Sequence, residues 1–263
     1  MNHSATIEIV AHRGGAALAP ENTLAAFRNA LALGVDAVEL DIHRSRDGAL
    51  VVIHSAELSE TTDGLGNVAD HDLDYLRTLN AAAWYTRWPT RETIPTLDEV
   101  LSLIQGRARV QIEIKPAERN GHYSRYPGIA AAVVTTLRAH KMLQDALIIS
   151  YDWQILPEIK HAAPEGAIGA IIAAESLARL PAPDNTSPLH ALPTIHQLHL
   201  DSIHVADELV TPELVLAAHE SGLRVGVWTV NEVARARELA AMGVDSITSD
   251  RPDLLLRTVR KHP

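Results

Sequence analysis

The sequence predicts an α/β protein of the (β/α)8 TIM-barrel class, because short apolar runs alternate with helical patterns along a chain of 263 residues. That length is sufficient for one large domain with a sizeable core, and 46 % of the residues are hydrophobic. No linker is rich enough in turn residues to divide the chain, so residues 1–263 are predicted to form a single domain. A doubly wound open sheet is the alternative, since the number of strands does not show that a sheet closes.

Eight apolar segments are the candidate barrel strands, and helical patterns separate them. They are Ile7–Ala11, Ala37–Ile42, Val110–Ile114, Leu147–Ser150, Ala167–Ile172, Ser202–Val205, Arg224–Thr229 and Asp245–Thr248. The helices between them have readable boundaries. Thr96, with Glu99 three residues later, predicts a capping box that opens a helix over Leu97–Ile104. Asn231 is a candidate cap for a helix over Glu232–Met242.

A short β-hairpin extension is predicted after the second strand, because Asp47-Gly48 is a dipeptide favoured in two-residue turns. Pairing outward from this turn places residue 46 opposite 49, 43 opposite 52 and 41 opposite 54. Side chains alternate between faces along a strand, so Glu39 and Asp41 share a face. Directly opposed residues of an antiparallel pair also share a face, and this register therefore brings His54 beside Asp41.

Bulk composition restricts the partners and the compartment. The net charge of -10 argues against a protein that binds nucleic acid or an anionic membrane. The chain contains no cysteine, which excludes disulfide frameworks and thiolate metal sites and is consistent with a reducing compartment. No signal peptide is apparent at the N-terminus, and no stretch reaches the ~20 apolar residues of a membrane span. We expect a cytoplasmic protein without stable membrane association; the oligomeric state cannot be predicted.

Three carboxylates lie near the carboxyl ends of predicted strands, where barrel enzymes carry their chemistry. Glu39 and Asp41 belong to the second barrel strand and Glu113 to the third. Polar residues inside apolar runs are costly unless they face a shared site. Carboxylates held close together repel each other, and their oxygens suit a hard cation. We therefore predict that these three residues bind one divalent cation, Mg²⁺ or Ca²⁺.

Cationic and titratable side chains occur at further strand ends. Arg13 and Lys115 suit a phosphate, the first as a planar fork and the second as a point charge. His12 and His54 titrate near neutrality and can act as a general acid–base pair. Trp228 ends the seventh strand, and it either packs at the barrel top or contacts substrate; we assign it to substrate binding. Together with a metal, these groups predict a phosphoryl-transfer site.

Structural roles compete with these assignments. Glu113 and Lys115 could form an internal ion pair, and His12 could be a buried structural histidine. His43 lies on the same predicted face as the carboxylates but nearer the turn, which favours a pocket-rim residue over a catalyst. The long polar segment Leu58–Asp74 is typical of a substrate lid on a compact barrel.

Taken in order, the motifs resemble the glycerophosphodiester phosphodiesterase family, and its compact cytosolic bacterial type most of all. The resemblance extends from near residue 10 to near residue 250, and the ordered set is much more specific than any single motif. The motifs are His12-Arg13-Gly14, Pro20-Glu21-Asn22-Thr23, Glu39-x-Asp41, Asp47-Gly48, His54, Thr61-Thr62-Asp63-Gly64, Ile94-Pro95-Thr96-Leu97, Glu113-Ile114-Lys115, Trp228-Thr229-Val230-Asn231 and Gly243-Val244-Asp245.

The resemblance implies a phospholipase-C-like barrel and the hydrolysis of glycerophosphodiesters to glycerol 3-phosphate and an alcohol. It implies the same division of roles: Glu39, Asp41 and Glu113 bind the metal, His12 and His54 exchange protons, and Arg13 and Lys115 hold the phosphate. It further implies that a neighbouring glycerol hydroxyl of the substrate is the nucleophile and that a cyclic phosphate forms, which water then opens.

Two positions depart from the family pattern. Ser55 follows the second histidine where an aspartate is usual, and Glu60 precedes the paired threonines where an arginine is usual. Two alternatives to the leading function follow: a phospholipase of the same superfamily that acts on intact lipid, and a homologue that binds diesters but is impaired in catalysis. The alcohol group of the substrate cannot be predicted from the motifs.

Overall fold

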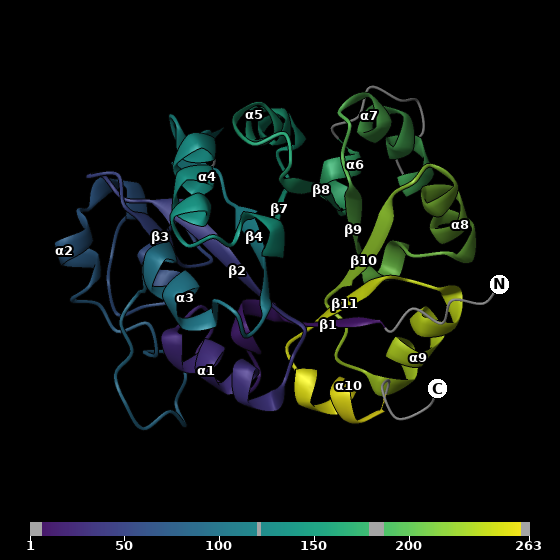
Figure 1. Cartoon of the computed structure of the whole chain (residues 1–263). Coiled ribbons are helices and arrows are strands. Elements are labelled where there is room, and N and C mark those ends of the chain that lie inside the picture. Colours follow the sequence, from purple (N-terminus) through teal and green to yellow (C-terminus); the bar gives the residue numbers. More distant parts are fainter. Residues whose placement is uncertain (1–6, 120–121, 179–186, 259–263) are drawn as a thin grey trace.

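The computed structural model describes residues 7–119, 122–178 and 187–258, and it shows a closed barrel of parallel strands surrounded by helices (Figure 1). Within these residues the barrel strands are β1 Glu8–Ala11, β2 Ala37–Arg44, β4 Arg109–Ile114, β7 Ala146–Ser150, β8 Ala167–Ile172, β9 Ser202–Ala206, β10 Arg224–Trp228 and β11 Ser246–Ser249. Each strand pairs with the next in this order, and β1 pairs with both β2 and β11. The sheet therefore closes, which confirms the barrel and excludes the open doubly wound sheet.

Helices follow the barrel strands and pack on their outer faces (Figure 1). They are α1 Leu24–Leu33, α3 Leu97–Ile104, α4 Ile129–Ala139, α5 Leu156–Ala162, α6 Ala174–Leu177, α7 Leu192–Gln197, α8 Pro212–Glu220, α9 Val233–Met242 and α10 Pro252–Thr258. The capping box of α3 is confirmed, because Thr96 and Glu99 exchange the two expected hydrogen bonds. No helix among the described residues is long and apolar enough to cross a membrane.

The prediction that Asn231 caps α9 is wrong. The N-cap position is Glu232, and its side chain makes no capping hydrogen bond. Asn231 instead faces the end of β11, where its amide donates to Asp250 Oδ2 at 2.8 Å and its carbonyl oxygen accepts from the Ser249 hydroxyl at 3.0 Å. The strand-end contacts have displaced the local helix cap.

Alternation along β2 separates the core from the barrel interior. Val38, Leu40 and Ile42 are fully buried among the residues of the main apolar core, which lies between strands and helices. Glu39 and Asp41 therefore point to the opposite side, into the barrel. Burial of the apolar side chains fixes the register of the strand, because a slip of one residue would place the carboxylates against the helices.

The hairpin exists, but its predicted register is wrong by one residue. β3, Leu50–Val52, runs antiparallel to β2, and the pairs are 44 with 50, 43 with 51 and 42 with 52. The loop has three residues, because Ser45 N–H donates to the Ala49 carbonyl and Gly48 adopts a left-handed φ of 96°. Three-residue loops that end in a left-handed residue are among the next most common hairpin connections.

Two further segments build the walls of the barrel mouth. The first segment follows β3 and ends with the short helix α2, Leu73–Leu76. This helix lies outside the ring of barrel helices (Figure 1). Leu58 and Val68, from the segment predicted as a lid, are buried with Leu76 in a second apolar cluster. After β4, strands β5 Ala117–Arg119 and β6 His122–Ser124 form a small antiparallel hairpin that the sequence did not reveal.

Candidate active site

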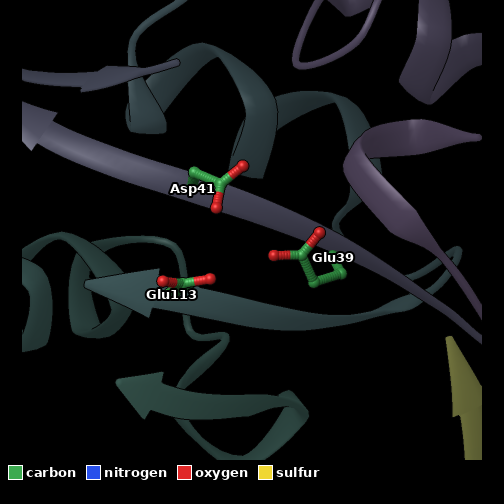
Figure 2. A group of neighbouring side chains, drawn as sticks. All are labelled: Glu39, Asp41 and Glu113. Atoms are coloured by element: carbon green, nitrogen blue, oxygen red, sulfur yellow. The ribbon is translucent and has the colours of Figure 1, made fainter. Parts of the chain in front are cut away.

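Glu39, Asp41 and Glu113 point toward one another from two adjacent strands (Figure 2). The parallel pairing of β2 with β4 sets Asp41 directly beside Glu113. Each of the three offers one carboxylate oxygen, and these oxygens lie within 4.8 Å of one another. Burial, together with the charge of Asp41, raises the pKa of Glu39 to about 8. Clustered and buried carboxylate oxygens suit a hard divalent metal, which would favour the ionised form of Glu39.

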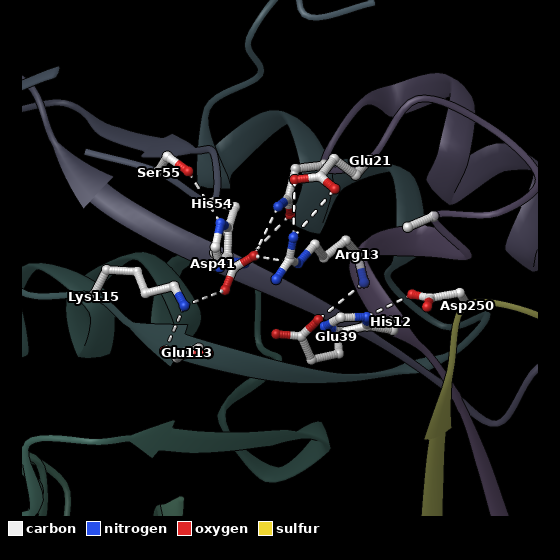
Figure 3. Close-up of polar contacts among 12 residues, drawn as sticks. His12, Arg13, Glu21, Glu39, Asp41, His54, Ser55, Glu113, Lys115 and Asp250 are labelled. Carbon is white, nitrogen blue, oxygen red and sulfur yellow. Dashed lines mark hydrogen bonds and ion pairs between the residues drawn. The ribbon is translucent and has the colours of Figure 1, made fainter. Parts of the chain in front are cut away.

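Asp41 is the centre of a buried charge network (Figure 3). Its two carboxylate oxygens lie 3.2 Å from Lys115 Nζ and 3.3 Å from Arg13 Nε, and the amide of Asn22 donates to it at 2.8 Å. Burial acts to raise the pKa of Asp41, but Lys115 and Arg13 hold it well below its usual range. Lys115 Nζ also lies 2.8 Å from Glu113, so the predicted alternative of an internal ion pair is present within the same cluster.

The turn after β1 aims Arg13 into this cluster. Arg13 adopts a left-handed φ of 50°, and its backbone N–H donates to Glu39 at 2.9 Å. Its guanidinium Nη1 binds both oxygens of Glu21 at 3.1 Å. Gly14 permits the turn, because it has a φ of 82° and a Cβ there would lie 2.7 Å from the Cβ of Ala26 on α1. Backbone strain of this kind is concentrated at functional sites.

His12 begins the same turn, and its ring is held by Asp250 at the end of β11 (Figure 3). Its Nδ1–H donates to Asp250 at 2.6 Å, which leaves Nε2 as the free acid–base atom. Burial acts to lower the pKa of His12, but the hydrogen bond to Asp250 and the charge of Glu39 outweigh it, so the pKa is raised. A carboxylate on one ring nitrogen both orients an imidazole and stabilises its protonated form.

His54 reaches the cluster although the predicted register was wrong. β3 ends at Val52 and the chain bends, so Ile53, not His54, bonds to the backbone of Asp41. The His54 side chain nevertheless lies beside Asp41 (Figure 3). Its Nδ1 is 3.1 Å from the Ser55 hydroxyl, at the position where an aspartate was expected. Burial is the main reason that the pKa of His54 is lowered, to about 3.

His43 supports this bend. It is 2 % exposed, and burial lowers its pKa to about 4, so its ring is neutral at pH 7. Nε2–H donates to the His54 carbonyl oxygen at 3.1 Å, and Nδ1 accepts from the Tyr126 hydroxyl at 2.9 Å. Both ring nitrogens are therefore engaged, which suits a residue that positions His54 at the pocket wall.

Two connected cavities meet at these residues. An inner cavity of about 210 Å³ is lined by His12, Arg13 and Glu39. An outer cavity of about 940 Å³ opens beside it toward the β5–β6 hairpin. Six residues line both: His54, Glu113, Lys115, Tyr151, Trp228 and Thr229. Trp228 Nε1–H donates to the His204 carbonyl oxygen at 2.9 Å, and its indole meets the Tyr151 ring edge-to-face at 5.9 Å. Trp228 is thus both packed at the barrel top and open to both cavities.

The structure brings all eight predicted site residues to one barrel mouth and adds four that the sequence reasoning missed. Asp250 and Tyr151 follow β11 and β7, so the rule that searched strand ends could have found both. Glu21 and Asn22 belong to a motif already noted, but nothing in the sequence alone indicated their contacts with Arg13 and Asp41.

Comparisons with known proteins agree with this geometry. The model of the glycerophosphoryl diester phosphodiesterase family matches residues 12–254. A glycerophosphodiester phosphodiesterase of Caldanaerobacter subterraneus subsp. tengcongensis is 33% identical over 255 residues, 96% of this chain and 98% of that protein. An Oleispira antarctica phosphodiesterase, solved in complex with the product sn-glycerol-3-phosphate, has a TM-score of 0.83 and 28% identity and covers 98% of this chain and 99% of its own.

A further solved relative is the glycerophosphodiester phosphodiesterase of Agrobacterium tumefaciens. It has a TM-score of 0.76 and 30% identity, and the match covers 95% of this chain and 99% of that one. The family match and these near full-length likenesses extend over the strands, turns and helices that build the barrel mouth. The chain therefore belongs to the glycerophosphoryl diester phosphodiesterase family and is an enzyme of the phosphoric diester hydrolase class.

Proposed function

We propose that this chain hydrolyses glycerophosphodiesters to sn-glycerol 3-phosphate and an alcohol, with one divalent cation and with His12 and His54 as the proton carriers. The observation that carries the proposal is the convergence of three clustered carboxylates, two cations and two histidines beside two cavities that share lining residues. The product bound to the Oleispira relative supports glycerol 3-phosphate as the retained half of the substrate. A single domain and a cytoplasmic location remain predictions.

Glu39, Asp41 and Glu113 would hold the cation. The fit rests on their buried oxygens, clustered within 4.8 Å, and on the raised pKa of Glu39, which reflects burial and the nearby charge of Asp41. When bound, a divalent cation supplies charge stabilisation to the phosphoryl oxygens. Mg²⁺ and Ca²⁺ both accept such ligands, so the donor set does not choose between them.

Arg13 and Lys115 flank the place where the phosphate would lie. Both side chains border the inner cavity, and both already neutralise the charge of Asp41. A phosphodiester anion between them gains two charge-assisted partners whose side chains are themselves largely buried. Because Glu21 binds Nη1 and Asp41 lies beside Nε, the guanidinium of Arg13 is held before substrate arrives (Figure 3).

The position of each histidine suggests its role. His12 borders the inner cavity, which we assign to the glycerol half, while His54 borders both cavities. His12 Nε2 takes the proton of the glycerol hydroxyl as its oxygen bonds to phosphorus, and Asp250 stabilises the imidazolium. The bond from phosphorus to the alcohol oxygen breaks, and His54 gives that oxygen its proton. Water then opens the cyclic phosphate with the two roles reversed.

His54 must become protonated when substrate binds. In the unliganded protein burial, Lys115 and Arg13 together outweigh Asp41 and keep its pKa at about 3. A phosphodiester anion bound between those two cations offsets their charge and so raises the pKa of His54. Proton uptake thus accompanies substrate binding.

A substrate panel tests the proposal. Glycerophosphocholine, glycerophosphoethanolamine and glycerophosphoglycerol are incubated with the protein after EDTA treatment, and again with added Mg²⁺ or Ca²⁺. We expect sn-glycerol 3-phosphate only when a divalent cation is present, because Glu39, Asp41 and Glu113 would repel the phosphoryl oxygens unless a cation offsets their charge. Tight diester binding without product under every condition would instead support the catalytically impaired homologue, and faster release from intact phospholipid vesicles would support the phospholipase.

Asp250→Asn should change both the rate and the pH profile. We expect kcat/KM to fall, by no more than the about 10²–10⁴ that acid–base catalysis contributes. Because Asp250 raises the pKa of His12, its neutral replacement lowers that pKa and moves the acidic limb of kcat/KM to lower pH. The matched control is Asp98→Asn, whose carboxylate binds His140 at 2.7 Å on the surface. An unchanged acidic limb would show that Asp250 does not act through His12.

A further inference from the structure

We infer that the outer cavity selects diesters whose alcohol carries a positive charge, such as a quaternary or primary ammonium group. The inference rests on the proposed function, because it assigns the outer cavity to the departing alcohol. His54, which would protonate that alcohol, borders this cavity, whereas His12 and Arg13 border only the inner one. The diester phosphate would lie at the junction of the two, beside Lys115.

Carboxylates from separate loops enclose the outer cavity. Glu57 and Glu60 follow β3, Glu118 lies on β5, Glu175 opens α6 after β8, and Glu208 follows β9. Since β3, β4, β8 and β9 occupy different sectors of the barrel, these side chains face the cavity from several directions. A negative charge spread around a cleft of low dielectric focuses the field within it and favours a cationic ligand.

The cations among the described lining residues do not offset this charge. They are Lys115 and Arg125. Lys115 lies 2.8 Å from Glu113 and 3.2 Å from Asp41, so carboxylates of the metal cluster already match it. Arg125 binds Asp152, also in the lining, through two of its nitrogens. The five rim glutamates therefore exceed the cationic charge of the cavity, so an anionic alcohol would enter against their field and a neutral alcohol would gain no attraction from it.

An aromatic corner gives the same cavity a second means of holding an ammonium group. Tyr151 and Trp228 meet edge-to-face at 5.9 Å and both line the cavity. A cation lies over the Tyr151 ring already, since Lys115 Nζ is 5.9 Å from its centroid. Aromatic faces attract ammonium groups and accept the apolar methyls of a quaternary one. The corner adjoins Lys115 and His54, where the departing oxygen would lie.

Two substrates of matched shape test the inference on the unmodified protein. The first is glycerophosphocholine, and the second is its neutral analogue, in which a quaternary carbon replaces the nitrogen. We expect kcat/KM to favour the choline ester by about 5- to 30-fold, and the preference to shrink as salt is added. Equal kcat/KM for the two esters would overturn the inference and leave the proposed function intact. If neither ester is hydrolysed with any metal, the proposed function itself fails.

Charge removal locates the effect. Glu60→Gln with Glu208→Gln removes two exposed rim charges that lie on different loops. We expect this double variant to lose most of the preference for the choline ester while the neutral analogue reacts at an equal or higher rate. The control is Glu213→Gln with Glu220→Gln, which removes two exposed charges of α8 outside the lining. An unchanged preference in the rim variant, or an equal loss in the control, would contradict selection by the rim.

Discussion

His54→Ala should lower the turnover of glycerophosphodiesters by about 10²- to 10⁴-fold, the usual contribution of acid–base catalysis, and leave the divalent cation bound. His54 is assigned as the donor of the proton that the departing alcohol receives. Without that proton, the alcohol oxygen is a poor leaving group. The metal should remain because the ligands proposed for it are Glu39, Asp41 and Glu113, and His54 is not among them. Steady-state kinetics and calorimetric titration with Mg²⁺ or Ca²⁺ measure the two parts separately.

Two controls separate catalysis from packing. Ser55→Ala removes only the hydroxyl that lies 3.1 Å from His54 Nδ1, and a neutral hydrogen bond of this kind should cost much less activity than the ring itself. His140→Ala removes a surface histidine that is paired with Asp98. Full activity of His54→Ala would remove His54 from the mechanism, and loss of metal together with activity would show that the ring supports the metal site.

A leaving group of low pKa offers a sharper test of the same residue. An alcohol that departs readily as an anion needs little proton donation. A glycerophosphodiester with a nitrophenol as its alcohol should therefore recover much of the rate lost in His54→Ala. It should not rescue His12→Ala, because His12 is assigned to the proton of the glycerol hydroxyl. Equal rescue of both variants would contradict the assignment of separate roles to His12 and His54.

The barrel strands could be predicted because burial of one face in the core leaves an alternating apolar pattern in the sequence of a strand. Val38, Leu40 and Ile42 alternate with Glu39 and Asp41, and only one register keeps the first three in the core. The same alternation identified both metal-ligand candidates of β2. Glu113 followed from the rule that strand ends share a site, and the pairing of β2 with β4 sets it beside Asp41.

The hairpin register could not be predicted from Asp47-Gly48 alone. A Gly at the second position suits a two-residue turn, but it suits equally the left-handed residue that ends a three-residue loop. Contacts distant in sequence stabilise the three-residue loop: Leu73 N–H donates to the Asp47 carboxylate, and Arg46 pairs with Asp72. His54 still reaches Asp41 because the chain bends after Val52, which pairing rules for strands do not describe.

Asp250 was missed for a related reason. It follows β11, where the strand-end rule applies, but an aspartate after a strand is usually solvated or paired locally. Its role comes from closure of the barrel, because the pairing of β11 with β1 sets the two strand ends side by side. Asp250 thereby reaches His12, which lies 238 residues earlier in the sequence. The same closure draws Asn231 away from the cap of α9.

Asp41→Asn should destabilise the metal-free protein by about 3–5 kcal/mol at pH 7, because it removes one partner of a buried charge network. Asp41 is 1 % exposed, and Lys115 and Arg13 would remain buried without the carboxylate that faces both. Its folded-state pKa is depressed, so its contribution is complete above the unfolded pKa and is lost only as the pH falls through the folded value. Urea unfolding monitored at neutral pH, in EDTA, measures the loss.

A surface pair provides the first control. Asp72→Asn removes a carboxylate that pairs with Arg46, where the two side chains are 45% and 61% exposed. Solvent and salt screen such a pair, so its loss should cost at most about 1 kcal/mol. Comparable losses in Asp41→Asn and Asp72→Asn would contradict a special stabilising role for the buried network.

Glu39→Gln, in the same carboxylate cluster, should behave in the opposite way. Burial and Asp41 raise the pKa of Glu39 to about 8, so this carboxyl is largely protonated at pH 7 without metal, and a neutral amide replaces it at little cost. A raised carboxyl pKa means that the wild type loses stability as the pH rises from about 4.5 toward 8, and the variant should be the more stable protein above that range.

With a divalent cation at a hundredfold excess over its Kd, the free energy of unfolding of the wild type should rise by about 2.7 kcal/mol, and both Asp41→Asn and Glu39→Gln should lose this gain. A metal-free Glu39→Gln protein as unstable as Asp41→Asn would show that Glu39 is held as an ion by Arg13, and that the cluster keeps its charge without metal.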